Sequence, residues 1–267
     1  MFISIVSTCI SFTTSYLFHL QVNYIFFAII FLSTFSSYNL HWYFTREVNE
    51  ENAFIEERSI WNQKNKSTIF IGFALSSFLL LFILFTNSKY IIYFIPAAIA
   101  TFLYTAPKLP INFLKQLEGK AWAKTAYLSA TWLYVTCILP FLIAGFKMNL
   151  STVKFMLINF IYFYLICLLF DYRDRKKEEV NIILIDNKKY FKSIYWGTTG
   201  FLGLLFLYNF QVNQTHLLAG YICGLLLLTL SYKKSTSDPT DKWYYFVLDG
   251  LMMLPGLINL FIILLIK

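Results

Sequence analysis

The stretch LLFDYRDRKKEE, from Leu168 to Glu179, closes a long apolar run and decides how the rest of the chain is interpreted. Its acids Asp171, Asp174 and Glu178 are spaced by three and four residues, which places all three on one face of a helix. Carboxylates crowded in this way repel one another unless basic side chains or a hard cation such as Mg²⁺ neutralise them. The stretch therefore indicates either a cation site at a membrane surface or a solvated charge cluster that only sets topology.

Composition places the chain in the membrane class. Its 267 residues are 58% hydrophobic and 20% aromatic but only 13% charged, and the mean hydropathy is +0.60. An ordinary soluble domain carries about 25% charged residues, so the soluble class is excluded. We predict an all-α polytopic membrane protein with a single transmembrane helical domain over residues 1–267.

The cysteines and the net charge narrow the possible partners. Cys9, Cys137, Cys167 and Cys223 lie in apolar runs without a CxxC pair or a His at metal-ligand spacing, so we interpret them as small core residues. The formal charge of +8 is carried by short loops rather than by one continuous patch. This distribution argues against nucleic acid and favours membrane lipid head groups or a diphosphate. The N-terminal apolar run has no signal-peptide features and is interpreted as the first span.

The apolar segments number nine, and each is expected to form a helix. They run roughly over residues 2–20, 24–44, 68–85, 90–104, 122–146, 153–170, 194–210, 217–232 and 243–266. Several are shorter than the ~20 residues that cross a bilayer, so they need flanking residues or a thinned membrane. The predicted architecture is a bundle of nine transmembrane helices.

Charged residues gather on one side of this arrangement. With the N-terminus inside, the loops after the even-numbered spans carry 18 of the 22 basic residues and 13 of the 14 acids. The opposite side has only Lys89, Lys147, Lys154 and Lys267, while Asp249 lies a short way into the ninth span. This asymmetry predicts that the N-terminus and the charged loops are cytoplasmic, in a bacterial inner membrane.

A second polar stripe leaves the membrane at the end of the second span. Its members, at offsets of four, eight and eleven, are Asn39, Tyr43, Glu47 and Glu50. Arg46 falls beside this stripe, whereas His41 points the opposite way and is interpreted as a hydrogen-bonded interfacial residue. Asn39 lies inside the apolar run, where an amide needs a partner helix or a ligand.

The loop after the fourth span begins YTAPKLP, with Tyr104, Pro107, Lys108 and Pro110. The prolines predict that the helix stops after Tyr104, which leaves Lys108 as a cation near the membrane surface. An interfacial tyrosine and positive-inside lysines explain most residues of this kind, so the loop alone assigns no chemistry.

Taken together, nine spans, acids after the second and sixth, and a Tyr and a Lys after the fourth resemble the UbiA superfamily of intramembrane prenyltransferases. In that family a motif NDxxDxxxD closes the second span and a motif DxxDxxxD closes the sixth. Asp171, Asp174 and Glu178 match the acids of the second motif. Tyr104 and Lys108 are similar to the family's YxxxK segment after the fourth span.

The first family motif is where the chain departs from the pattern. Aligned on Asn39, the sequence has Leu40 and Tyr43 in place of the first two aspartates and Glu47 in place of the third. Because the family's aspartates hold Mg²⁺ ions that bridge to the isoprenyl diphosphate, their loss is expected to weaken the site. Tyr43 either donates a hydrogen bond to phosphate or marks a site that no longer catalyses.

The resemblance implies a set of site residues. Mg²⁺ would be held by Asp171, Asp174, Glu178 and Glu47, and the catalytic residues would be Asp171, Asp174 and Tyr43. The diphosphate and the prenyl substrate would be bound by Asn39, Arg46, Tyr104, Lys108 and Arg175. This site requires Asn39 and Tyr43 to face Asp171 and Asp174 across a common cavity.

Three functions follow as alternatives. The first is a Mg²⁺-dependent prenyltransferase that transfers a prenyl group from an isoprenyl diphosphate to a lipid-soluble acceptor, with aromatic side chains sheltering the allylic cation. The second is a non-catalytic or repurposed UbiA-like protein that binds a polyprenyl or another lipid. The third is an unrelated transporter, for which Asp249 is the candidate intramembrane acid, although we interpret Asp249 as an interface-facing residue paired with a Lys.

Overall fold

The computed structural model describes residues 1–44, 57–105, 121–178, 188–210, 215–237, 240 and 242–266. For residues 57–59, 121–123, 174–178, 188–190, 209–210, 215–218 and 266 it describes the backbone alone. Within these ranges the chain contains helices and no strand, so the all-α prediction is confirmed.

Helices form wherever the sequence carries an apolar run. The first five runs are α1 (Phe2–Leu17), α2 (Tyr24–Tyr43), α4 (Lys66–Thr86), α5 (Ile91–Thr105) and α7 (Ala121–Leu133), the last continuing through η3 (Tyr134–Ile138) into α8 (Leu139–Ile143). The others are α9 (Leu150–Glu178), α10 (Lys188–Phe210), α11 (Thr215–Ser237) and η4 (Trp243–Leu248), which continues into α12 (Asp249–Ile266). Two short elements are α3 (Glu57–Lys64) and η1 (Ser88–Tyr90).

Five of the described helical stretches are long and apolar enough to cross a membrane. They are Tyr24–Tyr43, Lys66–Thr86, Lys124–Ile143, Leu150–Arg173 and Trp243–Leu265. The remaining apolar runs are also helical, but within the described residues each is either too short or not apolar enough to be counted as a span. These five agree with an integral membrane protein.

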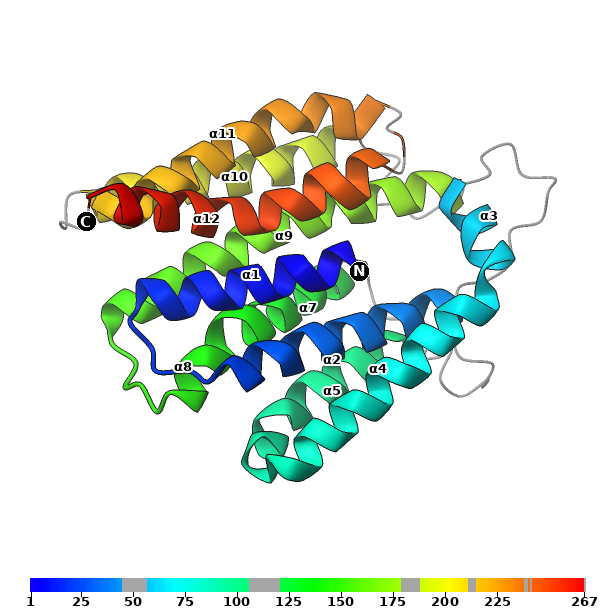
Figure 1. Ribbon diagram of the computed structural model, residues 1–267. Helices are drawn as coiled ribbons and strands as arrows, with labels where there is room; N and C mark the ends of the chain where they lie inside the picture. The colour runs from blue at the N-terminus through cyan, green and yellow to red at the C-terminus, as the bar shows by residue number, and fades with distance from the viewer. Residues whose placement is uncertain are drawn as a thin grey trace.

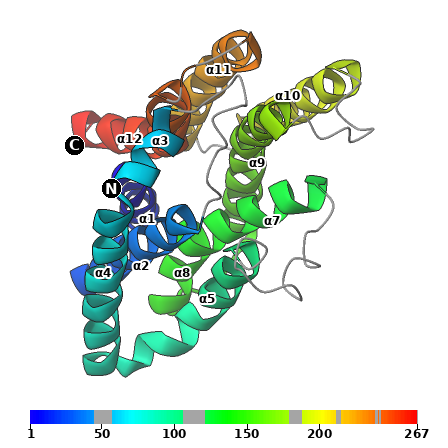
Figure 2. The ribbon, with the colours of Figure 1, turned by 90° about the vertical axis from the view of Figure 1, so that its right-hand side faces the viewer.

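The centre of the bundle is α9, which packs against α7, α10, α11 and α12. Its span is the most buried of the five, and Tyr162, Phe163, Leu165, Ile166 and Leu169 are fully buried. Seen nearly end-on, α10, α11 and α12 lie on one side and α4 and α5 on the other, with α1 and α9 between them (Figure 2). Burial of apolar surface around α9 is therefore what joins the two sides.

The helices alternate in direction, so the carboxyl ends of α2, α5 and α9 lie on the same side as the start of α12 (Figure 1). We call this side the predicted cytoplasmic end, because it carries the basic loops of the sequence.

Two helices are π-helical in part, over η3 and η4. A π-helical turn inserts a residue and rotates the side chains that follow, and such turns are frequent at functional sites.

Close helix packing at the opposite end depends on two glycines of α11. The backbone N–H of Gly220 donates to Asn259 Oδ1 at 2.8 Å, and a Cβ at that position would collide with the carbonyl oxygen of Pro255. A Cβ at Gly224 would lie 2.9 Å from Pro255 Cγ and from the Tyr162 hydroxyl oxygen. The absence of side chains at these positions lets α11 approach α12 and α9.

Two of the four cysteines are core residues as predicted. Cys137 and Cys167 are buried, and Cys9 is half-buried. Cys223 is exposed on α11, so its assignment to the core is wrong. All four thiols are free.

Candidate functional site

Tyr38 of α2 lies where five helices meet near the predicted cytoplasmic end. It interacts electrostatically with Asp249 of α12, with Tyr104 of α5 and with Cys167 of α9. Its hydroxyl is also hydrogen bonded to the side chain of Trp132 on α7, and an indole can only donate. A single tyrosine side chain thus brings together residues from both sides of the bundle.

Cys167 extends this group toward the acids of α9. The residue is 3% exposed, and its thiol is hydrogen bonded to Ser129, which is fully buried on α7. The thiol lies close enough to Asp249 and Asp171 to interact with both. We define the central cluster as Tyr38, Tyr104, Ser129, Trp132, Cys167, Asp171 and Asp249.

Two contacts with α9 set the depth of Asp249 in the bundle. The Tyr244 hydroxyl, which donates to the carbonyl oxygen of Ser235 at 2.6 Å, lies 3.5 Å from the carbonyl oxygen of Leu169, and the Tyr162 hydroxyl donates to that of Leu251 at 2.8 Å. Asp249 lies between these two contacts, at the level of the α9 segment that contains Cys167. Asp171 comes one helical turn later, about 6 Å closer to the predicted cytoplasmic end.

Asp249 is 8% exposed, on the inside of the bundle. Its interpretation as an acid facing the membrane interface is therefore wrong. A carboxyl group inside a membrane bundle costs free energy, and such residues most often serve function.

Tyr104 joins the ends of three helices. Its ring stacks on the imidazole of His41, with ring centroids 5.3 Å apart and planes at 25°. The ammonium of Lys124, on α7, lies 5.8 Å from the centroid of the Tyr104 ring. The structure therefore places Tyr104 in the central cluster with a cation beside it.

Asn39 and Tyr43 lie against α4 instead. The Asn39 amide donates to the carbonyl oxygen of Phe35, one turn earlier in its own helix, at 2.8 Å, and the side chain packs against Gly72. The Tyr43 ring contacts Phe70 at 5.3 Å and has the Lys66 ammonium 5.5 Å from its centroid. The expectation that these two residues face Asp171 across a common cavity is not met, because packing on Gly72 turns this side of α2 toward α4.

On α2 the residues that face the central cluster are Tyr38 and His41. They are three residues apart and so share a helix side, and His41 does point away from Asn39 and Tyr43 as its position predicts. Sequence reasoning assigned no role to Tyr38. The only feature of the sequence that could have indicated a role for Tyr38 is its hydroxyl group, one helical turn before the membrane surface.

Several predicted site residues lie wholly or partly outside the described part of the chain. Arg46, Glu47 and Lys108 lie outside the described residues. For Asp174, Arg175 and Glu178 the backbone continues α9, so the three acids of this stretch do lie on one helix, but their side chains are outside the description. Asp171 is half-buried at the edge of the central cluster.

The acids predicted to bind Mg²⁺ belong to α9. Among the described side chains, no group of three or more His, Cys, Asp and Glu residues is close enough to hold a metal ion. The helix nevertheless continues without a break through Glu178, so the backbone positions of Asp171, Asp174 and Glu178 lie on one side of α9. Carboxylate oxygens on one face are the ligands that Mg²⁺ prefers.

Arg173 fastens α9 to the start of the last helix. Arg173 is 6% exposed, and Nη2 of its guanidinium donates to the Tyr245 hydroxyl oxygen at 2.9 Å. The guanidinium carbon lies 4.5 Å from the ring centroid of Tyr244, 4.8 Å from that of Tyr245 and 5.4 Å from that of Phe170. Cation–π contacts of this kind are worth up to about 2 kcal/mol when desolvated, so this aromatic setting holds η4 in place.

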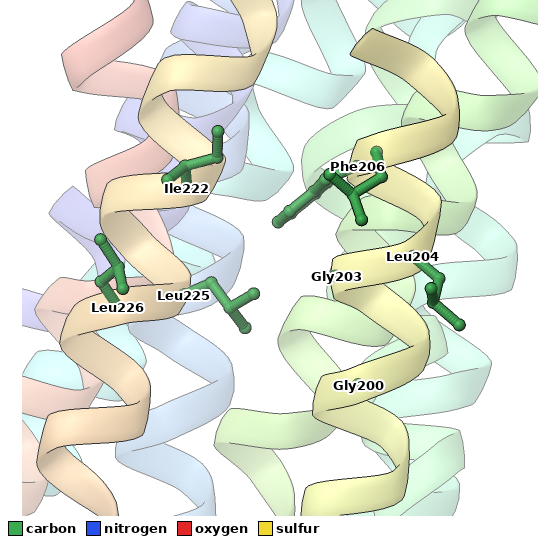
Figure 3. A pocket seen from close by; sticks show the side chains of 8 residues that line it. Gly200, Gly203, Leu204, Phe206, Ile222, Leu225 and Leu226 are labelled. Carbon is green, nitrogen blue, oxygen red and sulfur yellow. The ribbon is translucent and has the colours of Figure 1, made fainter. Parts of the chain in front are cut away.

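A separate apolar groove opens between α10 and α11 (Figure 3). Its volume is about 570 Å³, and its walls include Gly200, Gly203, Phe206, Ile222, Leu225 and Leu226. The lining is almost wholly apolar, with no charged side chain to hold an anionic group. The groove therefore contributes nothing to a diphosphate site.

No protein-family model matches the chain, and no curated protein or solved structure matches it significantly.

Proposed function

We propose that the chain is a UbiA-like membrane prenyltransferase, which transfers a prenyl group from an isoprenyl diphosphate to a lipid-soluble acceptor. In this proposal nine helices span a bacterial inner membrane, with the N-terminus and the charged loops in the cytoplasm. The observation that carries it is the meeting of α2, α5 and α9 at Tyr38, Tyr104 and Cys167. These are the three helices whose carboxyl ends bear the motif-like segments, and a diphosphate site built from those segments needs the three ends to converge.

The diphosphate would lie at the predicted cytoplasmic end of the central cluster. Asp171, Asp174 and Glu178 would hold Mg²⁺, whose positive charge neutralises the departing diphosphate. Lys124, beside Tyr104, supplies a cation at the same end, and Arg175 and Lys108 belong to adjoining segments. Cations placed where negative charge develops lower the barrier to ionisation.

The prenyl chain would extend into the membrane from the same place. The aromatic side chains of Tyr38, Tyr104 and Trp132 surround the level at which the first carbon of the chain would sit. Their ring faces stabilise a cation by up to about 2 kcal/mol each in a dry environment, and exclusion of water prevents its capture. These residues bind and shelter the reactive end of the substrate.

The test uses the full chain reconstituted in lipid nanodiscs. Farnesyl and geranylgeranyl diphosphate are supplied with Mg²⁺ or with EDTA, and binding and diphosphate release are measured. We expect Mg²⁺-dependent binding of at least one of the two and its loss in Asp171→Asn. A protein that binds neither substrate with Mg²⁺ present would exclude the proposal.

A second function is favoured by the position of Asn39 and Tyr43. Because both side chains pack against α4, none of the described residues of the first acid motif belongs to the central cluster. A repurposed protein that binds a polyprenyl or another lipid without transfer would need no second set of acids. Binding of farnesyl diphosphate that is equally strong in EDTA, without diphosphate release, would favour this alternative.

A further inference from the structure

The apolar groove between α10 and α11 lies away from the predicted cytoplasmic end (Figure 3). On α10 its walls run from Gly200 to Leu207, in the second half of the helix, and on α11 from Ile222 to Leu226, in the first half. At 1.5 Å per residue, this stretch of α10 covers about 12 Å. One leaflet contributes about 15 Å to the hydrocarbon core of a bilayer. The groove therefore lies at the depth of the lipid tails of that leaflet.

The groove has a buried inner wall and exposed edges. Phe206 forms the inner wall, is 4% exposed and has its ring 5.9 Å from that of Tyr221, whereas Leu204 and Leu207 at the edge are exposed. Gly203 widens the groove, since a Cβ there would meet no atom within 4 Å. The volume of about 570 Å³ is within the ~300–1,000 Å³ of ligand pockets. Because the walls are apolar, the matching occupant is a hydrocarbon chain.

A cation lies where α10 leaves the groove, at the end of the bundle opposite the predicted cytoplasmic end, which we call the outer end. Tyr208 follows Leu204 by one helical turn on the same side of α10. The ammonium of Lys154, on α9, lies 4.6 Å from the centroid of the Tyr208 ring. Lys154 is half-buried, one turn from the start of α9, and lysines at this depth extend their ammonium toward the lipid head groups.

The outer end carries positive charge without acids. In the predicted topology its segments are residues 17–25, 85–91, 143–155 and 209–217. They contain Lys89, Lys147 and Lys154 but no Asp or Glu. None of these segments supplies a carboxylate to balance Lys154. A phosphate group at the membrane surface supplies that charge, and a head group with a net negative charge does so better than a zwitterionic one.

We propose that the groove and Lys154 form a binding site for one anionic phospholipid, with an acyl chain between α10 and α11 and the phosphate at Lys154. Charge decides the occupant. A second copy of the chain, related by an axis along the membrane normal, would bring a second basic end against Lys154. The site is independent of the proposed prenyltransferase function, because neither the groove nor Lys154 belongs to the central cluster.

The test measures lipid binding to the full chain, delipidated in detergent, by native mass spectrometry. Dioleoylphosphatidylglycerol and dioleoylphosphatidylcholine are titrated separately, because they have the same acyl chains and differ in net charge. We expect the first phosphatidylglycerol to bind at least about fivefold more tightly than the first phosphatidylcholine, the contribution of one lysine beside an anionic lipid. Equal affinities would overturn the proposal.

A pair of lysine variants tests the position of the phosphate. Lys154→Gln should reduce the preference for phosphatidylglycerol to less than about twofold. Lys89→Gln is the matched control and should keep the wild-type preference. The Lys89 ammonium also lies over a tyrosine ring, 5.2 Å from the centroid of Tyr90, but between α4 and α5 and away from α10 (Figure 2). An equal loss in both variants would mean general attraction to a basic end, without a site.

A pair of glycine variants tests the position of the tail. Gly203→Leu puts a side chain into the groove and should weaken phosphatidylglycerol binding at least about tenfold, because the tail and the added carbons compete for one space. Gly197→Leu is the control on the same helix. A Cβ at Gly197 also meets no atom within 4 Å, and Gly197 is not one of the residues that line the groove. Wild-type affinity in Gly203→Leu would overturn the placement of the tail.

A measurement on the wild type decides the matter if Gly203→Leu does not fold. Phosphatidylglycerol with a diazirine in its acyl chain is bound and irradiated, and the labelled peptides are identified. We expect the label in α10 and α11 and little in α4 and α5. Label spread evenly over the helices would overturn the proposal. A dimer in the native spectra with α10 and α11 unlabelled would assign the groove to a second copy of the chain instead.

Discussion

Arg173 of α9 donates a hydrogen bond to the hydroxyl oxygen of Tyr245 in η4, with 2.9 Å between Nη2 and the oxygen. This bond and the rings on either side of the guanidinium connect the longest helix to the turn that immediately precedes Asp249. A substitution of Arg173 by an uncharged residue removes this hydrogen bond and also the cation that lies against the rings of Tyr244 and Tyr245. The position of Asp249 therefore depends on a contact that lies outside the central cluster.

Stability is expected to fall when this contact is removed. A hydrogen bond to a charged group is worth about 1.5–3 kcal/mol, and the cation–π contacts add to it. Arg173→Leu should therefore lower the apparent melting temperature in detergent more than Tyr245→Phe, which loses the hydrogen bond alone. Tyr208→Phe is the matched control, because its exposed ring keeps its contact with Lys154. Equal melting temperatures for Arg173→Leu and the control would contradict the assignment.

On α2, the two tyrosines are expected to differ in their effect on prenyl transfer. Tyr38→Phe removes a hydroxyl from the central cluster, so the rate should fall at least about tenfold, the size of one lost hydrogen bond in the reacting complex. Tyr43→Phe keeps the ring that contacts Phe70 and Lys66 and removes a hydroxyl outside the central cluster, so activity should change less than about threefold. A larger loss of transfer rate in Tyr43→Phe than in Tyr38→Phe would contradict this prediction and favour the site expected from the family motif.

The acids of α9 are expected to act in metal-dependent binding. Asp171→Asn and Asp174→Asn each remove a carboxylate charge at nearly constant volume, and both should abolish Mg²⁺-dependent release of diphosphate. The measurement is a titration with Mg²⁺ at fixed farnesyl diphosphate. Full activity of Asp171→Asn at the Mg²⁺ concentration that saturates the wild type would argue against metal binding by this residue.

Glycines of α10 and α11 are expected to respond in opposite ways to a methyl group. Gly220→Ala forces a Cβ into the Pro255 carbonyl oxygen, and overpacking of this kind costs about 1–3 kcal/mol. Gly200→Ala meets no atom within 4 Å and gains up to about 1 kcal/mol of helix propensity. Thermal unfolding should therefore separate the two variants, and destabilisation by Gly200→Ala would mean that this face of α10 is covered.

The charge asymmetry predicts which residues face the outside of the cell. A cysteine in place of Lys147 should react with a membrane-impermeant maleimide in intact cells, whereas one in place of Lys233 should react only after the membrane is opened. The parent chain, with its native cysteines, gives the background. Reaction of both variants in intact cells would overturn the orientation.

The amino-acid sequence determined where the helices lie and which side carries the charge. Apolar runs and their polar ends are local properties, and α9 begins near and continues past the residues predicted for the sixth span. The shared face of Asp171, Asp174 and Glu178 also follows from helix geometry alone, since spacing fixes angle once the helix is known.

Only the tertiary structure decided which residues meet inside the bundle. The hydropathy of α2 is nearly even around its axis, so its sequence did not distinguish the face of Asn39 and Tyr43 from that of Tyr38 and His41. Packing against Gly72 turned one face toward α4, and residues of four other helices surround Tyr38 and interact with it. The rotation of a helix about its axis in a membrane is set by its packing against all of its neighbours, and the sequence of one helix alone does not determine that packing.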